Sequence, residues 1–381
     1  MKTVYLDNAA TTPMRPEVID RMYTSMQQIY ANPSATYGIG RTSKANLEAA
    51  RKKIASLVHA DASEIIFTSG GTEANNLIIN SAVRDLGVTH IITSKIEHHA
   101  VLKAVKALEI AYPIKVSYVS LLPEGDIDID SLTTILANSK DKILVSLMHI
   151  NNEIGSILDV NVVGELCVKY NALFHTDMVQ SIGHYKIDFL NTPINFATAS
   201  AHKFYGPKGI GFAVIQKNSG IKALQYGGEQ ERGIRAGTES IHQIEGMAVA
   251  LELACTHMEI ETKAILKIKQ YAIAQLNNKF KAIGFNANSD KLYRNYNLLN
   301  VCLPISHEKA STTLFKLDML GVCCSRGSAC QSGSNKPSHV LAEILSEDQL
   351  TQTSLRFSFS IYTSTNDIDT LVDALDTILT K

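Results

Sequence analysis

Short, nearly continuous runs of apolar residues recur along the first half of the chain, and most of them end in polar or small residues. Runs of this kind are typical of strands in a parallel sheet that helices cover on both faces. The runs that predict strands lie at residues 64–68, 90–94, 115–120, 143–148, 172–176, 196–200 and 210–215. Helical spacing of apolar positions also occurs, for example over residues 47–58. The alternation of strands with helical stretches predicts an α/β fold.

The pattern changes after the last of these runs. A glycine-rich, charged segment at 227–238 is followed by a long helical stretch from about 240 to 280, and strands and helices are mixed beyond it. We place a domain boundary inside that helix. The expected large domain comprises residues 16–255, and residues 1–15 and 256–381 are expected to form a smaller α+β domain.

Polar side chains follow several of the predicted strands at the point where each strand ends. These side chains are Thr72, His98, Asn152, Asp177 and Lys203. In open, largely parallel sheets, ligands bind beyond the carboxyl ends of the strands. We therefore expect these five residues to face one crevice.

Lys203 is the first candidate for chemistry. It follows a run of small residues at 196–200, stands directly after His202, and is followed by a Gly-Pro turn. A lysine that forms a Schiff base has such a setting, because desolvation and positive neighbours free its amine. A solvated lysine in a surface turn would show the same pattern, so this stretch alone leaves both interpretations open.

The segment Ser69-Gly70-Gly71-Thr72 lies between a predicted strand and a predicted helix. Bare N–H groups and the helix dipole meet at such a place, so the segment predicts an anion site. The ending of a Walker P-loop is absent, so a phosphate that stays in place, as on a cofactor, fits better than a transferable one. An ordinary turn with a threonine cap is the alternative.

Two charged residues suggest more specific binding roles. Asp177, at a strand end, can pair with a pyridinium nitrogen and keep it protonated, which makes the ring an electron sink. A helix N-cap is the alternative for this residue. Arg356 lies in an alternating, strand-like segment at 354–358 and can bind a substrate carboxylate through two hydrogen bonds. A surface ion pair is the alternative for Arg356.

Composition limits the compartment and the partners. The 381 residues are 45% hydrophobic and 19% charged, with a formal net charge of -1, which is ordinary for a soluble globular protein. Nucleic acid and anionic membranes are therefore not expected partners. The N-terminus lacks the apolar stretch of a signal peptide, and no apolar run approaches membrane-spanning length. We expect a cytoplasmic protein.

The cysteines are sparse, and three of the six lie late in the chain, at Cys323, Cys324 and Cys330. Cys330 lies in a Gly/Ser-rich segment, where a thiol is available for chemistry. Cys323 and Cys324 lie in a more apolar stretch and are expected to pack. No Cys-x-x-Cys pair or matching histidine pair accompanies them, so no metal site is expected.

Several short motifs occur in a defined order along nearly the whole chain. They are residues 5–12, 32–34, 68–73, 97–98, 151–153, 202–203, 232–238 and 327–330. With these motifs the chain resembles the cysteine desulfurases of the NifS/IscS type, which are class-V aminotransferase-like, fold-type I enzymes that use pyridoxal 5'-phosphate (PLP). The resemblance implies a large domain with a mainly parallel seven-stranded sheet flanked by helices, and a smaller α+β domain that carries the cysteine segment.

The resemblance implies a role for each candidate at the cofactor. Lys203 would hold PLP covalently and move the α-proton of the substrate, and His98 would stack on the pyridine ring. Asp177 would pair with the ring nitrogen and Gln180 with the phenolic oxygen. The phosphate-binding residues that it implies are Gly71, Thr72, Ser200 and His202, with Thr238 reaching the phosphate of the partner subunit in a homodimer.

The resemblance also implies a reaction. Asn152 and Arg356 would hold the carboxylate of L-cysteine, and Cys330 would accept the sulfur as a persulfide and leave L-alanine. The catalytic residues would be Lys203, His98 and Cys330, and the persulfide would pass to an acceptor protein, either a scaffold or a sulfur carrier. The receiving pathway stays open, with iron–sulfur cluster assembly among the candidates.

Two other functions remain as alternatives. One is a selenocysteine lyase or another class-V activity such as an aminotransferase, and the other is a catalytically inactive sulfur-relay scaffold. Two departures from the family pattern also stand out. Gly71 stands where relatives often have alanine, which we expect to be harmless. Ser360 and Tyr362 occupy the region where the family often has a glycine and a second arginine, which affects the substrate pocket rather than the chemistry.

Overall fold

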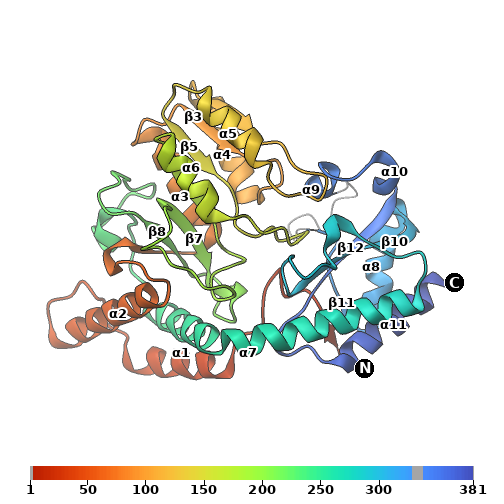
Figure 1. Ribbon diagram of the computed structural model, residues 1–381. Coiled ribbons are helices and arrows are strands. Elements are labelled where there is room, and N and C mark those ends of the chain that lie inside the picture. Colours follow the sequence, from red (N-terminus) through yellow and green to blue (C-terminus); the bar gives the residue numbers. More distant parts are fainter. Residues whose placement is uncertain (1–2, 328–337, 381) are drawn as a thin grey trace.

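A seven-stranded sheet forms the centre of the larger part of the molecule in the computed structural model, which describes residues 3–327 and 338–380 (Figure 1). In spatial order its strands are β2 (Ile65–Thr68), β8 (Gly211–Ile215), β7 (Phe196–Ser200), β6 (Leu173–Asp177), β5 (Ile143–Ser146), β3 (His90–Thr93) and β4 (Lys115–Tyr118). All neighbours run parallel except at β8, which is antiparallel to both β2 and β7. The predicted α/β fold with a mainly parallel seven-stranded sheet is confirmed.

Helices cover both faces of this sheet. One face is covered by α3 (Gly71–Arg84) and α4 (His99–Ala111). The other face is covered by α1 (Pro16–Gln28), α2 (Gly38–Leu57), α5 (Ile129–Ala137), α6 (Val160–Lys169) and the first half of α7 (Ile241–Lys279). Every residue of β2, β3, β5, β7 and β8 is buried, which explains their continuous apolar runs.

A second apolar core, centred on Leu299, Leu355 and Leu371, lies beside the first. Its sheets are β12 (Gln352–Ser358), β10 (Leu298–Ser306) and β9 (Gly284–Phe285), all antiparallel, and the parallel pair β1 (Val4–Tyr5) with β11 (Val322–Cys323). Its helices are the second half of α7, α8 (Ala310–Met319) and α11 (Thr365–Leu379). The N-terminal residues therefore pack with the C-terminal ones.

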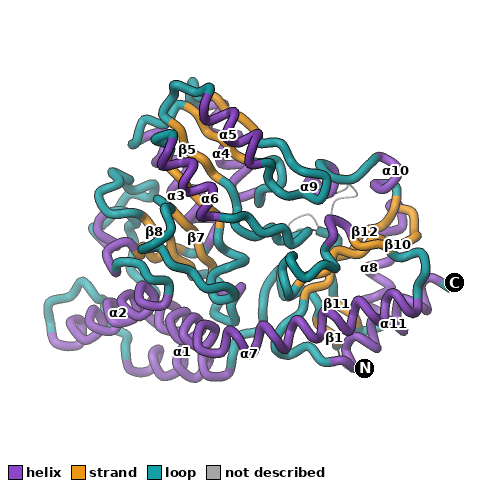
Figure 2. The backbone as a smooth tube through the Cα atoms, in the orientation of Figure 1, coloured by secondary structure: helices purple, strands orange, loops and turns teal. Residues whose placement is uncertain are grey.

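Helix α7 contributes to both cores. Ile244 and Leu251 pack in the first core, whereas Ile265 and Leu276 pack in the second. At about 1.5 Å per residue, its 39 residues span roughly 58 Å. Figure 2 shows this helix running along one side of the molecule, from α1 and α2 to α11. The helix predicted at 240–280 is confirmed to within one residue at each end, while the domain division near residue 255 stays a prediction.

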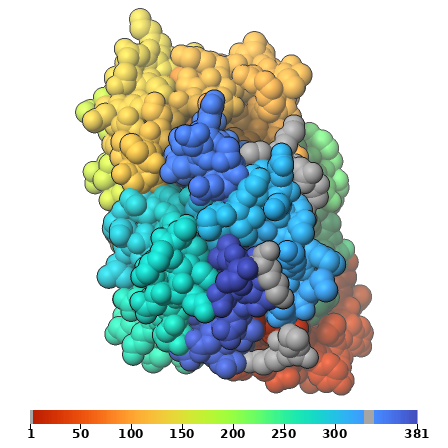
Figure 3. Space-filling model, turned by 90° about the vertical axis from the view of Figure 1, so that its right-hand side faces the viewer, coloured from red at the N-terminus to blue at the C-terminus, as the bar shows by residue number. Residues whose placement is uncertain are grey.

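Two short helices from the C-terminal part, α9 (His339–Ala342) and α10 (Glu347–Leu350), lie against the first part of the molecule. Val340 and Leu341 form a small apolar cluster with Ile96 and Ile154. Figure 3 shows this segment in blue, in contact with the elements coloured yellow and orange. None of the helices in the described part of the chain is long and apolar enough to cross a membrane.

The short 3-10 helices lie in the connections between these elements. They are η1 (Ala62–Glu64), η2 (Ala201–Lys203), η3 (Gln230–Gly233), η4 (Asn286–Asn288) and η5 (His307–Lys309). The one that matters most for the site is η2, because it follows β7 directly and ends at Lys203. It therefore presents this lysine at the carboxyl end of the sheet.

Candidate active site

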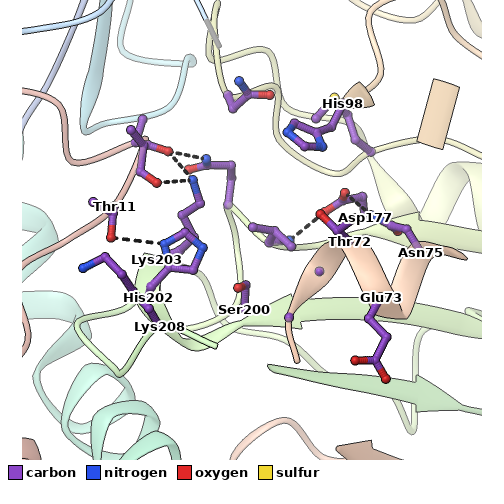
Figure 4. A pocket seen from close by; sticks show the side chains of 18 of the residues that line it. Thr11, Thr72, Glu73, Asn75, His98, Asp177, Ser200, His202, Lys203 and Lys208 are labelled. Atoms are coloured by element: carbon purple, nitrogen blue, oxygen red, sulfur yellow. Dashed lines mark hydrogen bonds between the residues drawn. The ribbon is translucent and has the colours of Figure 1, made fainter. Parts of the chain in front are cut away.

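A cavity of about 490 Å³ opens beyond the carboxyl ends of the parallel strands (Figure 4). Pockets of this size are typical of small-molecule and cofactor sites. Ten of the residues singled out in the sequence line it: Gly71, Thr72, His98, Asn152, Asp177, Gln180, Ser200, His202, Lys203 and Arg356. Thr238 is exposed and is not part of this lining, and Cys330 lies outside the described residues.

The amine of Lys203 is held at the cavity wall by the N-terminal segment. Its Nζ donates to the carbonyl oxygens of Ala9 and Ala10, at 2.5 and 2.8 Å. Gln180 Nε2 also donates to the carbonyl of Ala9, at 3.0 Å. Because these residues are alanines, the backbone of the N-terminal segment can come close to the lysine. The small residues of that segment thus place carbonyl acceptors at the site, a role that the sequence pattern did not reveal.

Asp177 ends β6 and is oriented by two hydrogen bonds. Its Oδ2 accepts from Asn75 Nδ2 at 2.7 Å, and its Oδ1 accepts from the backbone N–H of Val179 at 3.0 Å. Asn75 is itself buried on α3, and its Oδ1 accepts from the hydroxyl of Thr198 at 3.2 Å. Asp177 is therefore built to present an oriented acceptor to the cavity.

Asn75 is a functional residue that sequence reasoning missed. It lies three positions after Thr72 on α3, and residues at this spacing share a face of a helix. An amide on the buried face, next to Leu77 and Ile78, was the available signal. A buried amide needs hydrogen-bond partners, and here both of its polar atoms have them.

His98 presents a neutral ring to the same cavity. It caps the N-terminus of α4, where its Nδ1 accepts from the backbone N–H of Ala100 at 3.1 Å. An accepting Nδ1 places the ring proton on Nε2. Burial is the main reason that the pKa of His98 lies below its usual range. In Figure 4 the ring lies on the same side of the cavity as Asp177, across from Lys203.

The N-terminus of α3, where the sequence predicted an anion site, lines the cavity. Its N-cap is Gly70, whose φ of 144° is accessible mainly to glycine, and no side chain among the described residues caps the first turn. Thr72 and Ser200 add hydroxyl groups to the same wall of the cavity. Unpaired N–H groups and the positive end of the helix dipole favour a phosphate here.

His202 contributes to the electrostatics of this wall. Its Nδ1 lies 3.2 Å from the hydroxyl of Thr11. Burial first, and then the positive charges of Lys203 and Lys208, lower the pKa of His202 to about 4. The imidazole is therefore neutral near pH 7, while the two neighbouring ammonium groups make the wall favourable for an anion.

Arg356 also lines the cavity and is almost fully buried. Its guanidinium donates to Asp7 Oδ1 at 2.7 Å and to the carbonyl oxygen of Asn152 at 2.8 Å. Its Nε has no hydrogen-bond partner among the described residues. The ion pair with Asp7 is thus buried on the arginine side, not the surface pair that the sequence left open.

The thiols of the described cysteines are poor candidates for nucleophilic chemistry. Burial raises the pKa of Cys167 to about 12 and that of Cys255 to about 11. The pKa values of Cys302, Cys323 and Cys324 are also raised, mainly by burial. A thiol acts as a nucleophile in its thiolate form, so these residues are suited to packing. Within the described residues, no group of three or more His, Cys, Asp or Glu side chains could hold a metal ion.

Comparisons with known proteins agree on one family. The family described as aminotransferase class-V matches residues 4–371. A cysteine desulfurase IscS of Dictyoglomus turgidum is 39% identical over 383 residues, which cover 100% of this chain and 95% of that protein. A solved structure of a NifS-like protein has a TM-score of 0.90 and 32% identity, over 99% of both chains. A structure described as SspA in complex with cysteine has a TM-score of 0.81 and 32% identity, over 95% of this chain and 100% of that chain.

Proposed function

The chain belongs to the class-V aminotransferase family, and from this premise we propose that it is a PLP-dependent cysteine desulfurase that converts L-cysteine to L-alanine. One observation carries the proposal: a lysine amine, an oriented carboxylate and an uncapped helix N-terminus face one cavity. The similarity to cysteine desulfurases over the full chain sets the reaction apart from the alternatives. A selenocysteine lyase, an aminotransferase and an inactive scaffold are not favoured.

The donors and acceptors of the cavity suit PLP. The phosphate would be bound by the hydroxyls of Thr72 and Ser200, by His202, and by backbone N–H groups at Gly71, where no side chain caps the helix. Asp177 would accept a hydrogen bond from the ring nitrogen, Gln180 would pair with the phenolic oxygen, and the neutral ring of His98 would stack on the pyridine. When bound, PLP supplies a sink for the electron pair left on the α-carbon of the substrate.

Each of the chain's own groups around the cavity would have a separate role. Lys203 would hold the cofactor through Nζ, and its amine would take the proton from the α-carbon of the substrate. The carbonyls of Ala9 and Ala10 orient that amine. Asp177 presents an oriented acceptor at the opposite side of the cavity. Asn152 and Arg356, which both line the cavity, hold the substrate carboxylate.

Cys330 is proposed as the sulfur acceptor, although it lies outside the described residues. Its thiolate attacks the sulfur of the substrate, and the new S–S bond forms as the carbon–sulfur bond breaks. The electron pair of the broken bond stays with the carbon, which gains a proton and completes alanine. The sulfur remains on Cys330 as a persulfide. The raised pKa values of the five described thiols support this choice.

A homodimer is part of the proposal. Thr238 is exposed outside the cavity, where it could reach the phosphate in the partner subunit. Ile19, Tyr23 and Met26 form an exposed apolar stripe along α1, with the exposed Tyr30 just beyond it. Apolar stripes of this kind are commonly covered by another chain. The proposal also includes a cytoplasmic location, delivery of the sulfur to an acceptor protein, and a division into residues 16–255 and residues 1–15 with 256–381.

Two substitutions test the proposed function. The purified protein should be yellow and should form alanine from L-cysteine, and Lys203→Ala should lose both properties. Cys330→Ala should keep the colour, because the cofactor stays bound. Its rate of alanine formation should fall at least about 100-fold, because the nucleophile is removed. Cys255→Ala, on α7, serves as the matched control and should keep both. Full alanine production by Cys330→Ala would exclude a desulfurase that acts through this thiol.

A further inference from the structure

His184 makes two short hydrogen bonds at the back of the lysine segment. It lies in the connection between β6 and β7 and is buried, with 6% of its surface exposed. Its Nε2 lies 2.8 Å from the backbone carbonyl oxygen of Lys203, and its Nδ1 lies 2.8 Å from the hydroxyl of Tyr296. The first of these bonds joins the imidazole directly to the residue that carries the proposed chemistry.

The two bonds determine where the protons lie. A carbonyl oxygen can only accept, so Nε2 carries the proton and donates to Lys203. Burial lowers the pKa of His184, so the ring is neutral and Nδ1 is an acceptor. Tyr296 must then donate its hydroxyl proton to Nδ1. The chain of donors therefore runs in one direction, from Tyr296 through His184 to the carbonyl of Lys203.

The segment that contains His184 can come close to the lysine segment because of a glycine. Gly183 precedes His184 and has a φ of 81°, which favours glycine. A Cβ at Gly183 would lie 2.6 Å from the Cβ of Phe204, the residue after the lysine. A side chain at position 183 would thus push His184 away from η2.

Tyr296 connects this arrangement to the second core. It is buried there, and the partly buried Tyr185 packs beside it, with the two ring centroids 5.6 Å apart. Its hydroxyl also interacts with the side chain of Thr262 on α7, the helix that runs through both cores. The position of the Lys203 backbone is therefore tied, through one imidazole, to the part of the molecule formed by the C-terminal residues.

We propose that His184 is a positioning residue: by holding the backbone carbonyl of Lys203, it fixes the position of the lysine amine at the cavity wall. Its effect on kinetics rests on the proposed function, in which Lys203 is the catalytic amine. A displacement of a catalytic group by about 1 Å can cost a factor of about 100 in rate, so loss of the anchor acts on turnover. Substrate binding through Asn152 and Arg356 does not involve His184, so KM is affected little.

Three variants test this role in the full-length protein. His184→Ala should lower kcat about ten-fold with KM changed by less than about two-fold. His184→Gln can donate and accept at similar places and should restore most of kcat. Tyr296→Phe removes one hydroxyl, leaves the proton of His184 free to move to Nδ1, and should give an intermediate loss. Because this last change is small, it tests the anchor even if His184→Ala does not fold.

A second readout does not depend on activity. Amide hydrogen exchange of residues 201–206 should be about ten-fold faster in His184→Ala than in the wild type, since the segment has lost a tether. His90→Ala is the matched control, because His90, the first residue of β3, is also buried and bonds through both nitrogens, to Ser139 and Ser117. It should lower stability without changing exchange at 201–206.

The outcomes separate the two claims. If the wild type is colourless and forms no alanine, the proposed function fails, while the exchange comparison still tests the anchor. If His184→Ala merely lowers the melting temperature as His90→Ala does, with kcat and local exchange unchanged, the positioning role is overturned. Slower turnover together with faster exchange, both reversed by His184→Gln, supports it.

Discussion

Asn75 carries no charge, yet the orientation of Asp177 depends on it. Its Nδ2 donates to Oδ2 at 2.7 Å, and both side chains are buried. We expect Asn75→Leu, which keeps the volume and removes the donor, to lower kcat/KM by about ten-fold while the cofactor stays bound. Steady-state kinetics and cofactor absorbance would measure this. Asn80→Leu, on the same helix but outside the cavity, is the control, and equal losses in both variants would contradict the assigned role.

Glu97 is a buried carboxyl next to His98. Its Oε1 accepts from the backbone N–H of Met148 at 2.8 Å, and its Oε2 has no partner among the described residues. Burial raises its pKa well above the usual value of 4.5. The folded protein therefore keeps Glu97 protonated at a pH where the unfolded chain has released the proton, so this residue lowers stability as pH rises from 4.5 toward its folded pKa.

Glu97→Gln should remove this pH dependence, since glutamine stays neutral in both states. Relative to the wild type, the variant should gain stability between pH 5 and pH 8 by about 1.4 kcal/mol for each unit by which the pKa is raised within that range. Urea unfolding at the two pH values measures the difference. Glu259→Gln, at an exposed position on α7, should show none. A parallel response of Glu97→Gln and wild type would mean that Glu97 is ionised in the folded state.

At the scale of elements, the start of α3 depends on a close contact. A Cβ at Gly71 would lie 2.6 Å from Cγ2 of Val179, which follows β6 near Asp177. The glycine at this position therefore fits the valine opposite. We expect Gly71→Ala to destabilise the protein by about 1–3 kcal/mol and to weaken cofactor binding, because the helix N-terminus must shift.

A compensating change tests this contact. Val179→Ala removes the methyl group that a new Cβ would meet, so the double variant Gly71→Ala/Val179→Ala should be more stable than the sum of the single changes predicts. The coupling should lie between about 0.5 and 3 kcal/mol, as for residues in contact. Urea unfolding of the four proteins gives this number, and strict additivity would show that α3 accommodates the alanine without displacement.

The whole molecule holds several histidines neutral by burial, and this sets its response to acid. Burial lowers the pKa of His149 and of His175 to about 4 in each case. Between pH 6.5 and pH 4 the unfolded chain binds protons at these sites while the folded protein does not. Their contribution to stability is therefore full above pH 6.5 and is lost as pH falls toward 4, by up to about 1.4 kcal/mol per pH unit for each residue.

His175→Gln isolates one part of this response. Although the variant loses the bond between His175 and Ser146, its stability should change less between pH 7 and pH 5 than that of the wild type. His257→Ala, at an exposed position on α7, is the control and should follow the wild type. Chemical unfolding at pH 7 and pH 5 measures the free energy of unfolding of each protein. If all three lose the same stability, His175 does not contribute to the acid response.

The sheet strands, the long helix and the strand-end residues were predictable because each leaves a local pattern. A strand buried on both faces must be apolar throughout, and the helix at 240–280 repeats its apolar positions at helical spacing. Parallel strands end at one edge of a sheet, so the crevice followed from the order of elements. The PLP site and the desulfurase reaction came from the resemblance, which rests on short motifs whose order is specific although each alone is weak.

The amino-acid sequence alone therefore specifies local chemistry: which segments are strands and helices, and which residue types stand at their ends. Tertiary structure alone decided which distant groups meet. The carbonyls of Ala9 and Ala10 reach Lys203, Asn75 reaches Asp177, and His184 reaches the backbone of Lys203. These contacts join residues that are up to 194 positions apart. Local periodicity contains no information about such pairs, because they exist only once the chain has folded.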